Sequence, residues 1–420
     1  MKEVPSSHLS PPVRATDADR RKRRQTIEDN ILPQVKKPRS NYSPALVKDP
    51  EPPQENYPIT NEQGYYIVRP GARLTDRYDV IKKLGEGTFG TVVEAYDRKR
   101  KYNVAIKVTR NIDRYREAAL IEKRILRHLY TNSSHKYHTI TMLGYFAFHD
   151  HVCLSFERAG PTLHHVLHLN RAGFDLETLR TIAYQIFRCI AFIHDLGLIH
   201  TDLKTENIIF SNKNYTYSPN AGNAFIKVID FGSAMFERER LPKLACTRQY
   251  RPPEILLGIP WGKAADIWSI GCILYEMATG ELLFSTHCNW EHLQMIHRLF
   301  GPCPVNMVRR AKAHSTPSSV YFNTNLELRS LTVKSQRERV KMCGSPRTTE
   351  LLATEEHIAE SLEVLKNFKR FDKIKDPLLL DVIRKCLKWD PNDRISAADL
   401  VQHPFILRPK SSSSQSSDSE

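Results

Sequence analysis

The sequence predicts an α+β fold of two unequal lobes, a small β-rich lobe at about 75–159 and a larger, mainly helical lobe at about 160–408. Three observations predict it. Runs rich in β-branched and aromatic residues cluster between residues 78 and 108. Apolar residues at helical spacing follow over 115–130. Long helical patterns then dominate after about residue 175.

Each expected element has its own signal along the chain. Alternating or β-branched runs predict the strands, and apolar residues three and four apart predict the helices; the expected elements are strands at 78–82, 91–96 and 103–108 and helices at 115–130, 176–196 and 376–389. Residues 314–358 are polar and weakly periodic, so we expect a long insertion of partial order there.

Composition excludes several classes of protein. The chain is 40% hydrophobic and 26% charged, as in ordinary globular proteins, and no apolar run is long enough to span a membrane. The first ten residues lack the apolar core of a secretion signal, and the eight cysteines include no C-x-x-C pair, so we expect a soluble intracellular protein without a zinc site. The net charge of +15 fits contact with nucleic acid, anionic surfaces or acidic proteins, or nuclear residence, without choosing among them.

The two ends of the chain are expected to be disordered. Residues 1–74 are rich in proline and poor in apolar residues, and 409–420 are serine with acidic residues at the end. Basic clusters at 20–24 and 36–39 resemble a bipartite nuclear import signal. The alternative is a solvated basic arm or a tail that contacts RNA.

The first motif along the chain that indicates a chemical activity is a glycine-rich loop. Residues 85–92 match G-x-G-x-x-G-x-V, and their glycines would let backbone N–H groups approach phosphate oxygens; the loop comprises Gly85, Glu86, Gly87, Thr88, Phe89, Gly90 and Val92. Such a match alone is a weak signal. The loop lies between two strands, whereas a dinucleotide site runs from a strand into a helix, which argues against an NAD enzyme.

Charged and polar residues further along the chain complete the set of candidate site residues. Lys107 lies in an apolar strand and needs an anionic partner, which Glu122 on the next helix can supply. In His200-Thr-Asp-Leu-Lys-Thr-Glu-Asn207, Asp202 can accept the proton of an acceptor hydroxyl and Lys204 can neutralise the moving phosphoryl group. Asn207 and Asp230, the latter in D-F-G, suit magnesium ligands.

These motifs, in this order, resemble the eukaryotic protein kinase superfamily over about residues 78–407. Further matches are Arg251-Pro-Pro-Glu254 at the place of the A-P-E motif, 266–271 at a helix of the large lobe, and Arg394 as the arginine that pairs with the A-P-E glutamate. The resemblance implies a bilobal protein kinase fold, with ATP and Mg²⁺ as cofactors.

The sequence also resembles one particular branch of this superfamily. Thr201 replaces the arginine of H-R-D, and residues 230–234, 111–119 and 291–301 resemble the Cdc-like (LAMMER) dual-specificity kinases, the last of these in divergent form. The resemblance implies Ser/Thr kinase activity, with tyrosine as a further acceptor left open. It also implies residence in the nucleus, with the cytoplasm as a second site, and arginine/serine-rich splicing factors as substrates, so that the enzyme would regulate RNA splicing.

The resemblance implies further site residues. The ATP site would add Leu84 beside the loop, Ala105 and Val92 flanking the base, Phe156 as gatekeeper, and the hinge from Glu157 to Ala159. Glu206 would pair with a substrate arginine, whereas His165 falls where relatives have a carboxylate.

Two other classes of function compete with an active kinase. The first is a pseudokinase scaffold, which would be free to lose the charged residues that this chain retains. The second is an RNA-binding arm, but its basic clusters lack interleaved aromatic residues, so direct nucleic-acid binding is not expected. The oligomeric state stays open.

Overall fold

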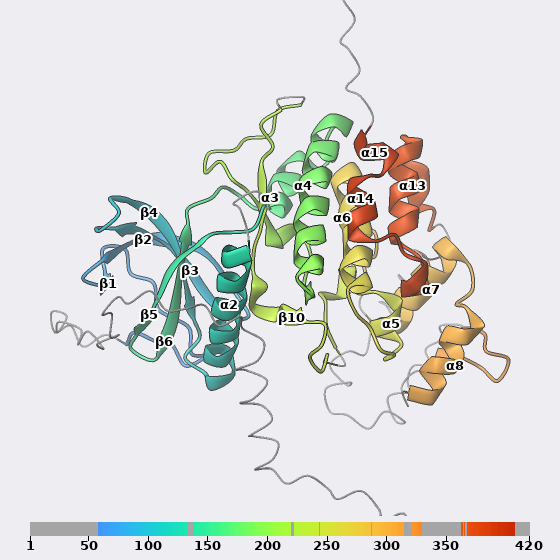
Figure 1. Ribbon diagram of the computed structural model, residues 1–420, viewed down its shortest axis with the longest axis horizontal. Coiled ribbons are helices and arrows are strands. Elements are labelled where there is room, and N and C mark those ends of the chain that lie inside the picture. The colour runs from blue at the N-terminus through green and yellow to red at the C-terminus, as the bar shows by residue number, and fades with distance from the viewer. Residues whose placement is uncertain are drawn as a thin grey trace, which may run out of the picture. The chain divides into compact units, whose positions relative to one another are not determined.

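The computed structural model describes residues 58–132, 138–219, 222–242, 244–286, 288–314, 321–329, 363, 365 and 368–407 (Figure 1). The chain divides into two units, Met1–Glu51 and Pro52–Glu420, and all the described residues belong to the second. The basic clusters at 20–24 and 36–39, the tail at 409–420 and most of the expected insertion at 314–358 lie outside the described residues.

The small lobe is an antiparallel sheet with one helix against it. Its six strands lie in the order β1-β2-β3-β4-β6-β5. Their bounds are Arg73–Thr75 (β1), Tyr78–Gly87 (β2), Gly90–Asp97 (β3), Tyr102–Thr109 (β4), Met142–Phe148 (β5) and His151–Glu157 (β6). The helix α2, Asp113–Asn132, packs on β4, β5 and β6. Alternate residues of β4, namely Val104, Ile106 and Val108, are fully buried, which is the pattern that predicted this strand.

The start of the small lobe differs from the expectation. Residues 58–74 were expected to belong to a disordered arm, yet Thr60 pairs with Tyr66 and β1 pairs with β2. Tyr66 and Leu74 are buried in the core of this lobe. The expectation is wrong here because a low average hydrophobicity hides two residues that are enough to anchor the segment.

The large lobe is helical. Its helices are Leu163–Asn170 (α3), Leu176–Asp195 (α4), Pro253–Leu256 (α5), Ala264–Thr279 (α6), Asn289–Phe300 (α7), Val305–His314 (α8), Pro377–Cys386 (α13), Ala397–Val401 (α14) and Pro404–Leu407 (α15). Two short antiparallel pairs complete it, Leu198–Ile199 (β7) with Met235–Phe236 (β10), and Ile208–Phe210 (β8) with Ile226–Val228 (β9). The small β-rich lobe followed by a helical lobe confirms the predicted fold class.

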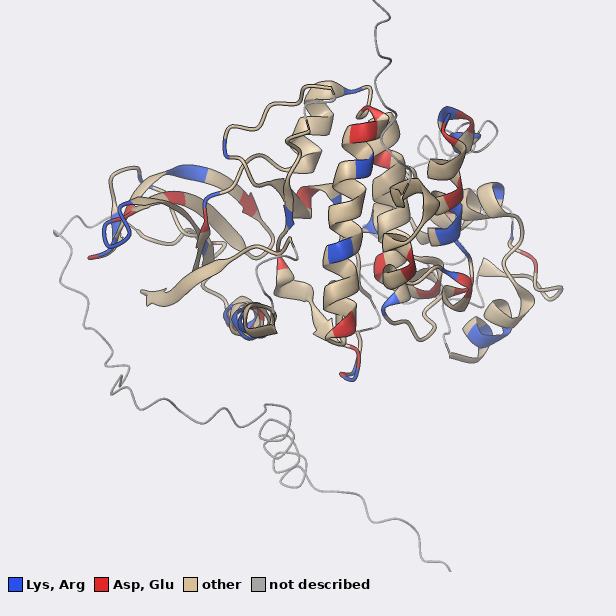
Figure 2. Ribbon diagram, turned by 45° about the horizontal axis from the view of Figure 1, so that its top comes forward, with Lys and Arg blue, Asp and Glu red and all other residues tan. Residues whose placement is uncertain are grey.

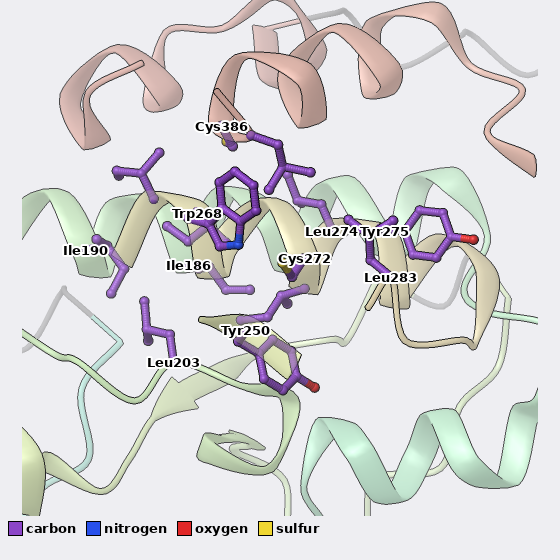
Figure 3. Packing of buried hydrophobic residues seen from close by; sticks show 14 of the residues in the cluster. Ile186, Ile190, Leu203, Tyr250, Trp268, Cys272, Leu274, Tyr275, Leu283 and Cys386 are labelled. Atoms are coloured by element: carbon purple, nitrogen blue, oxygen red, sulfur yellow. The ribbon is translucent and has the colours of Figure 1, made fainter. Parts of the chain in front are cut away.

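Helices α4 and α6 form the centre of the large lobe. Asp175 caps α4 by accepting hydrogen bonds from the backbone of Glu177 and Thr178. The side chains of α6, among them Trp268, lie between residues of α4 and α13 (Figure 3). Gly271 permits this contact, because a Cβ there would lie 2.7 Å from Leu387.

Part of the expected insertion is ordered against α7. Within residues 321–329, Phe322 pairs with Leu328 and is buried. The carbonyl of Arg329 accepts hydrogen bonds from Trp290 and Gln294.

Acidic and basic positions are interspersed on both lobes (Figure 2). Among the described helices, none is long and apolar enough to cross a membrane.

Candidate active site

One cavity of about 1290 Å³ brings the sequence-predicted residues together. It lies under the glycine-rich loop between β2 and β3 and extends over the segment that follows β7. All the predicted site residues line it, namely Leu84, Gly85, Glu86, Gly87, Thr88, Phe89, Gly90, Val92, Ala105, Lys107, Glu122, Phe156, Glu157, Ala159, Asp202, Lys204, Glu206, Asn207 and Asp230. His165 lines it as well.

Lys107 joins the two lobes at the back of this cavity. Its Nζ lies 2.9 Å from Glu122 Oε2 on α2 and 2.7 Å from Asp230 Oδ1. Burial opposes the charge of Lys107, but the two carboxylates outweigh it and raise its pKa. Burial likewise opposes the charge of Asp230, and Lys107 outweighs it and lowers the pKa of Asp230. The lysine therefore stays an ammonium, as contact with phosphate oxygens requires.

Asp230 is held in an unusual backbone conformation. Its φ of 61° lies in the left-handed region, which costs free energy in a residue with a side chain. The turn Phe231–Ser233 (η2) follows, and Phe231 is buried with its ring centroid 5.0 Å from that of His200. Packing of this phenylalanine compensates the strain and points Asp230 toward Lys107.

Asp202 is fixed by a network that the sequence did not predict. Thr247 donates from both its N–H (3.1 Å) and its hydroxyl (2.6 Å) to Asp202 Oδ1. Lys204 Nζ donates to Asp202 Oδ2 and to the hydroxyl of Thr247, each at 2.9 Å. The amide of Asn207 donates to the carbonyl of Asp202 at 2.8 Å. Asp202 thus faces the cavity in a fixed orientation, suited to aligning an acceptor hydroxyl and taking its proton.

The backbone around Asp202 is anchored from below by Asp266 on α6. Its carboxylate accepts from the N–H groups of His200 (2.8 Å) and Thr201 (3.0 Å) and lies 2.9 Å from His194 Nε2. Burial opposes ionisation of Asp266, but these donors prevail and lower its pKa. The hydroxyl of Thr201 donates to the carbonyl of Ser233, so the residue at the place of the H-R-D arginine connects the loop of Asp202 to the loop of Asp230.

Asn207 and Asp230 fit a divalent cation. They offer hard oxygen ligands on one wall of the cavity, and Asn207 uses its NH₂ group toward Asp202, which leaves its carbonyl oxygen available. Cations of the Mg²⁺ type take one or two such protein ligands, with the remaining positions filled by water and phosphate oxygens. Such an ion supplies neutralisation of phosphate charge when bound.

The walls of the cavity beside the β4–β6 ladder are apolar. Ala105 and Phe156 face each other across the β4–β6 ladder. Ile209 and Ile229 also line the cavity and were not predicted. Their positions in the sequence, two residues after Asn207 and one residue before Asp230, could have identified them as residues of the cavity wall.

A second carboxylate lies next to Glu206. Thr205 Oγ1 is 3.0 Å from Glu276 Oε1 on α6 and 3.4 Å from Glu206 Oε2, so the two acids are neighbours. Tyr250 donates to Glu276 at 2.6 Å. His164 Nδ1 lies 3.9 Å from Glu276, and its bond to Glu276 outweighs partial burial and raises the pKa of His164. We call Glu206 and Glu276 the acidic subsite; Glu276 was missed because it lies far away in sequence.

The segment after Asp230 is held in place by contacts with both lobes. Its strand β10 pairs with β7, and the Phe236 ring packs against His128 of α2 at 5.6 Å. Glu239 lies 3.6 Å from Arg124 of α2, and Glu237 lies 2.9 Å from Lys263. Residues 234–246 contain no serine, threonine or tyrosine.

The base of this segment is locked by a buried ion pair. Arg394 donates to both oxygens of Glu254, at 2.7 and 2.6 Å, and neither side chain is exposed. The resemblance in sequence implied this pair. The bidentate geometry fixes where the segment re-enters the large lobe.

Comparisons with known proteins agree with this geometry. A family profile described as protein kinase domain matches residues 78–406. Serine/threonine-protein kinase AFC2 of Arabidopsis thaliana is 35% identical over 83% of this chain and 81% of its own length. Dual specificity protein kinase CLK1 of Homo sapiens is 35% identical over 82% of this chain and 69% of its own length.

A solved structure gives the same result for the fold. The crystal structure of the PF14_0431 kinase domain superimposes with a TM-score of 0.71 at 31% identity, and the match covers 82% of this chain and 100% of that one. With the charged residues gathered in one cavity, the profile match and the relatives, the chain belongs to the protein kinases, within their Cdc-like (LAMMER) branch.

Proposed function

We propose that this kinase uses Mg²⁺ and ATP to phosphorylate serine and threonine in arginine-rich proteins, of the kind found among arginine/serine-rich splicing factors, and thereby regulates RNA splicing. The observation that carries the proposal is the acidic subsite on the substrate side of Asp202. Glu206 is half-buried and lines the cavity, and Glu276 stands behind it with only 5% of its side chain exposed. An arginine two or three residues before the target hydroxyl is the group that such a pair would bind.

The presence of Glu276 changes the expected strength of this preference. With Glu206 alone, and His165 in place of a carboxylate, one partly exposed pair would give about 0.2–1 kcal/mol, a several-fold preference at most. A second and buried carboxylate strengthens the field at the subsite, because its charge is less screened by water. We therefore expect a preference for upstream arginine of about ten-fold.

A pair of peptides tests the substrate class. The peptides differ only in arginine or glutamine two and three residues before a single serine, and kcat/KM is compared for wild type and Glu206→Gln. Wild type should favour the arginine peptide, and Glu206→Gln should lose most of that preference. Lys385→Gln, a change on α13 outside the cavity lining, is the control. A preference for acidic flanks would overturn the proposal, and a failure to label either peptide would favour the pseudokinase alternative.

Acceptor and metal are tested in the same assay. Replacing the target serine by tyrosine measures whether the enzyme has dual specificity. Replacing Mg²⁺ by Ca²⁺, which takes more ligands at longer distances, should abolish turnover if Asn207 and Asp230 hold a small octahedral ion.

We also propose that the basic clusters direct the protein to the nucleus. They supply two runs of Lys and Arg at the separation of a bipartite import signal. Alanine at residues 20–24 together with Lys36 and Lys37 should move a fluorescent fusion into the cytoplasm. Unchanged nuclear accumulation would show that the clusters serve another purpose, such as RNA contact.

A further inference from the structure

A short hairpin before the family-matched region packs against the active-site machinery. Residues 58–66 turn at Asn61–Gly64, where the N–H of Gly64 donates to the carbonyl of Asn61 at 2.9 Å. The carbonyl of Gly64 accepts from the N–H of Asn111, the second residue after β4, at 2.8 Å. The hydroxyl of Thr60 lies 2.8 Å from His151 Nε2 at the start of β6. The hairpin is therefore fixed at its turn, by Gly64, and along its first strand, by Thr60.

Arg110 connects this hairpin to α2. Its guanidinium lies between two rings, 4.4 Å from the centroid of Tyr65 and 4.8 Å from that of Tyr115. It donates from Nε to the carbonyl of Gln63 at 2.9 Å and from Nη1 to the hydroxyl of Tyr115 at 3.2 Å. A planar cation enclosed by two aromatic faces and fixed by hydrogen bonds is a rigid connection.

Tyr115 continues the connection to the glycine-rich loop. Its ring packs edge-on against Phe89, with centroids 5.9 Å apart. The carbonyl of Phe89 accepts from the N–H of Arg110 at 2.9 Å, and Lys107 Nζ lies 5.4 Å from the Phe89 ring. Phe89 is half-buried, whereas its neighbours Gly87 and Thr88 are exposed, so Phe89 is the anchor of the loop tip.

We propose that residues 58–66 position the glycine-rich loop for ATP, with Tyr65 and Arg110 as positioning residues that act through Tyr115 and Phe89. A glycine-rich loop has many accessible conformations, and closing it over phosphates costs entropy at each residue that becomes ordered. The stack from Tyr65 to Phe89 orders the loop before ATP arrives. The hairpin is part of this chain, so the device acts within one molecule.

The proposal predicts a specific kinetic signature. Tyr65→Ala removes one face of the stack and should raise KM for ATP about five-fold, the ratio equivalent to about 1 kcal/mol of cation–π interaction. The kcat at saturating ATP and the KM for peptide should stay within about two-fold, because Asp202 and its network are untouched. Tyr65→Phe keeps the ring and should behave as wild type. Arg110→Lys keeps the positive charge but loses the planar guanidinium group, and should raise the KM for ATP as Tyr65→Ala does.

A matched control and a double-mutant cycle separate positioning from general stability. Tyr145→Ala removes another cation–π pair of the same lobe, in which Lys123 of α2 lies 3.9 Å from the ring, and should leave KM for ATP unchanged. Thermal unfolding of each variant measures any loss of stability. If Tyr65 acts through Phe89, the variant with Tyr65→Ala and Phe89→Leu should show no larger effect than Phe89→Leu alone. An unchanged KM for ATP in Tyr65→Ala, or effects of the two changes that multiply, would overturn the proposal.

Discussion

Thr247 offers the most direct test of how Asp202 is oriented. Thr247→Val preserves the shape of the side chain and the backbone N–H bond at 3.1 Å, but removes the hydroxyl that donates to Asp202 at 2.6 Å and accepts from Lys204 at 2.9 Å. Asp202 then loses one of the donors that fix its Oδ1, and Lys204 loses an acceptor. Both groups gain freedom to leave the aligned geometry.

The magnitude follows from the charge on Asp202. A hydrogen bond to a charged group contributes about 1.5–3 kcal/mol, so kcat should fall by about ten- to a hundred-fold. Thr247→Ser keeps the hydroxyl and should retain kcat within about three-fold. The KM for ATP should hardly change in either variant, because the hydroxyl of Thr247 bonds Asp202 and Lys204 and not the glycine-rich loop.

Steady-state phosphorylation of a serine peptide, with ATP and peptide varied in turn, measures these constants. A kcat for Thr247→Val within three-fold of wild type would refute the assignment of Thr247 as a positioning residue. A Thr247→Ser enzyme as slow as Thr247→Val would show that the hydroxyl is not sufficient and that the methyl group is needed as well.

Four further outcomes are expected. Asp230→Asn should abolish transfer of label from ATP while the melting temperature is retained, because it weakens the metal site and the contact with Lys107. Protein made in bacteria and treated with phosphatase should keep most of its activity, since uncharged Thr201 stands where the arginine of H-R-D helps to receive a phosphate on the segment between Asp230 and Glu254; loss of nearly all activity would contradict this. Arg394→Met should lower the free energy of unfolding by about 3–5 kcal/mol in urea titrations, because it leaves Glu254 charged, buried and unpaired. The preference for arginine peptides should fall between pH 8 and pH 6, because protonated His164 then cancels part of the acidic subsite, and His164→Gln should remove this dependence on pH.

The residues of phosphoryl transfer could be predicted from the sequence because each is unusual in its setting. Lys107 is a charge in an apolar strand, and Asp202, Asn207 and Asp230 stand at fixed distances within short motifs. Such local signals can be recognised in the sequence without knowledge of the fold. The structure places all of them around one cavity.

Thr247 and Glu276 could not be predicted, because each acquires its role from a partner that is distant in sequence. Thr247 meets Asp202 across 45 residues, and Glu276 meets Thr205 across 71. A threonine in a loop and a glutamate in a helix are common, and only the tertiary contacts with Asp202 and Thr205 distinguish these two. The hairpin at 58–66 was not predicted for a different reason. The disorder prediction rested on the average composition of residues 1–74, and an average does not reveal single anchoring residues such as Tyr66.

The segment after Asp230 has a consequence for control of the enzyme. Glu237 and Glu239 form ion pairs with Lys263 and Arg124, and we expect these carboxylates to serve in place of the added phosphate that holds this segment in kinases switched by its modification. Residues 234–246 offer an upstream kinase no serine, threonine or tyrosine, and the hydroxyl of Thr247, which follows this stretch, is already bonded to Asp202. Output in a cell would scale with the number of molecules and with access to substrate, so synthesis, turnover and compartment become the places where a cell can adjust it.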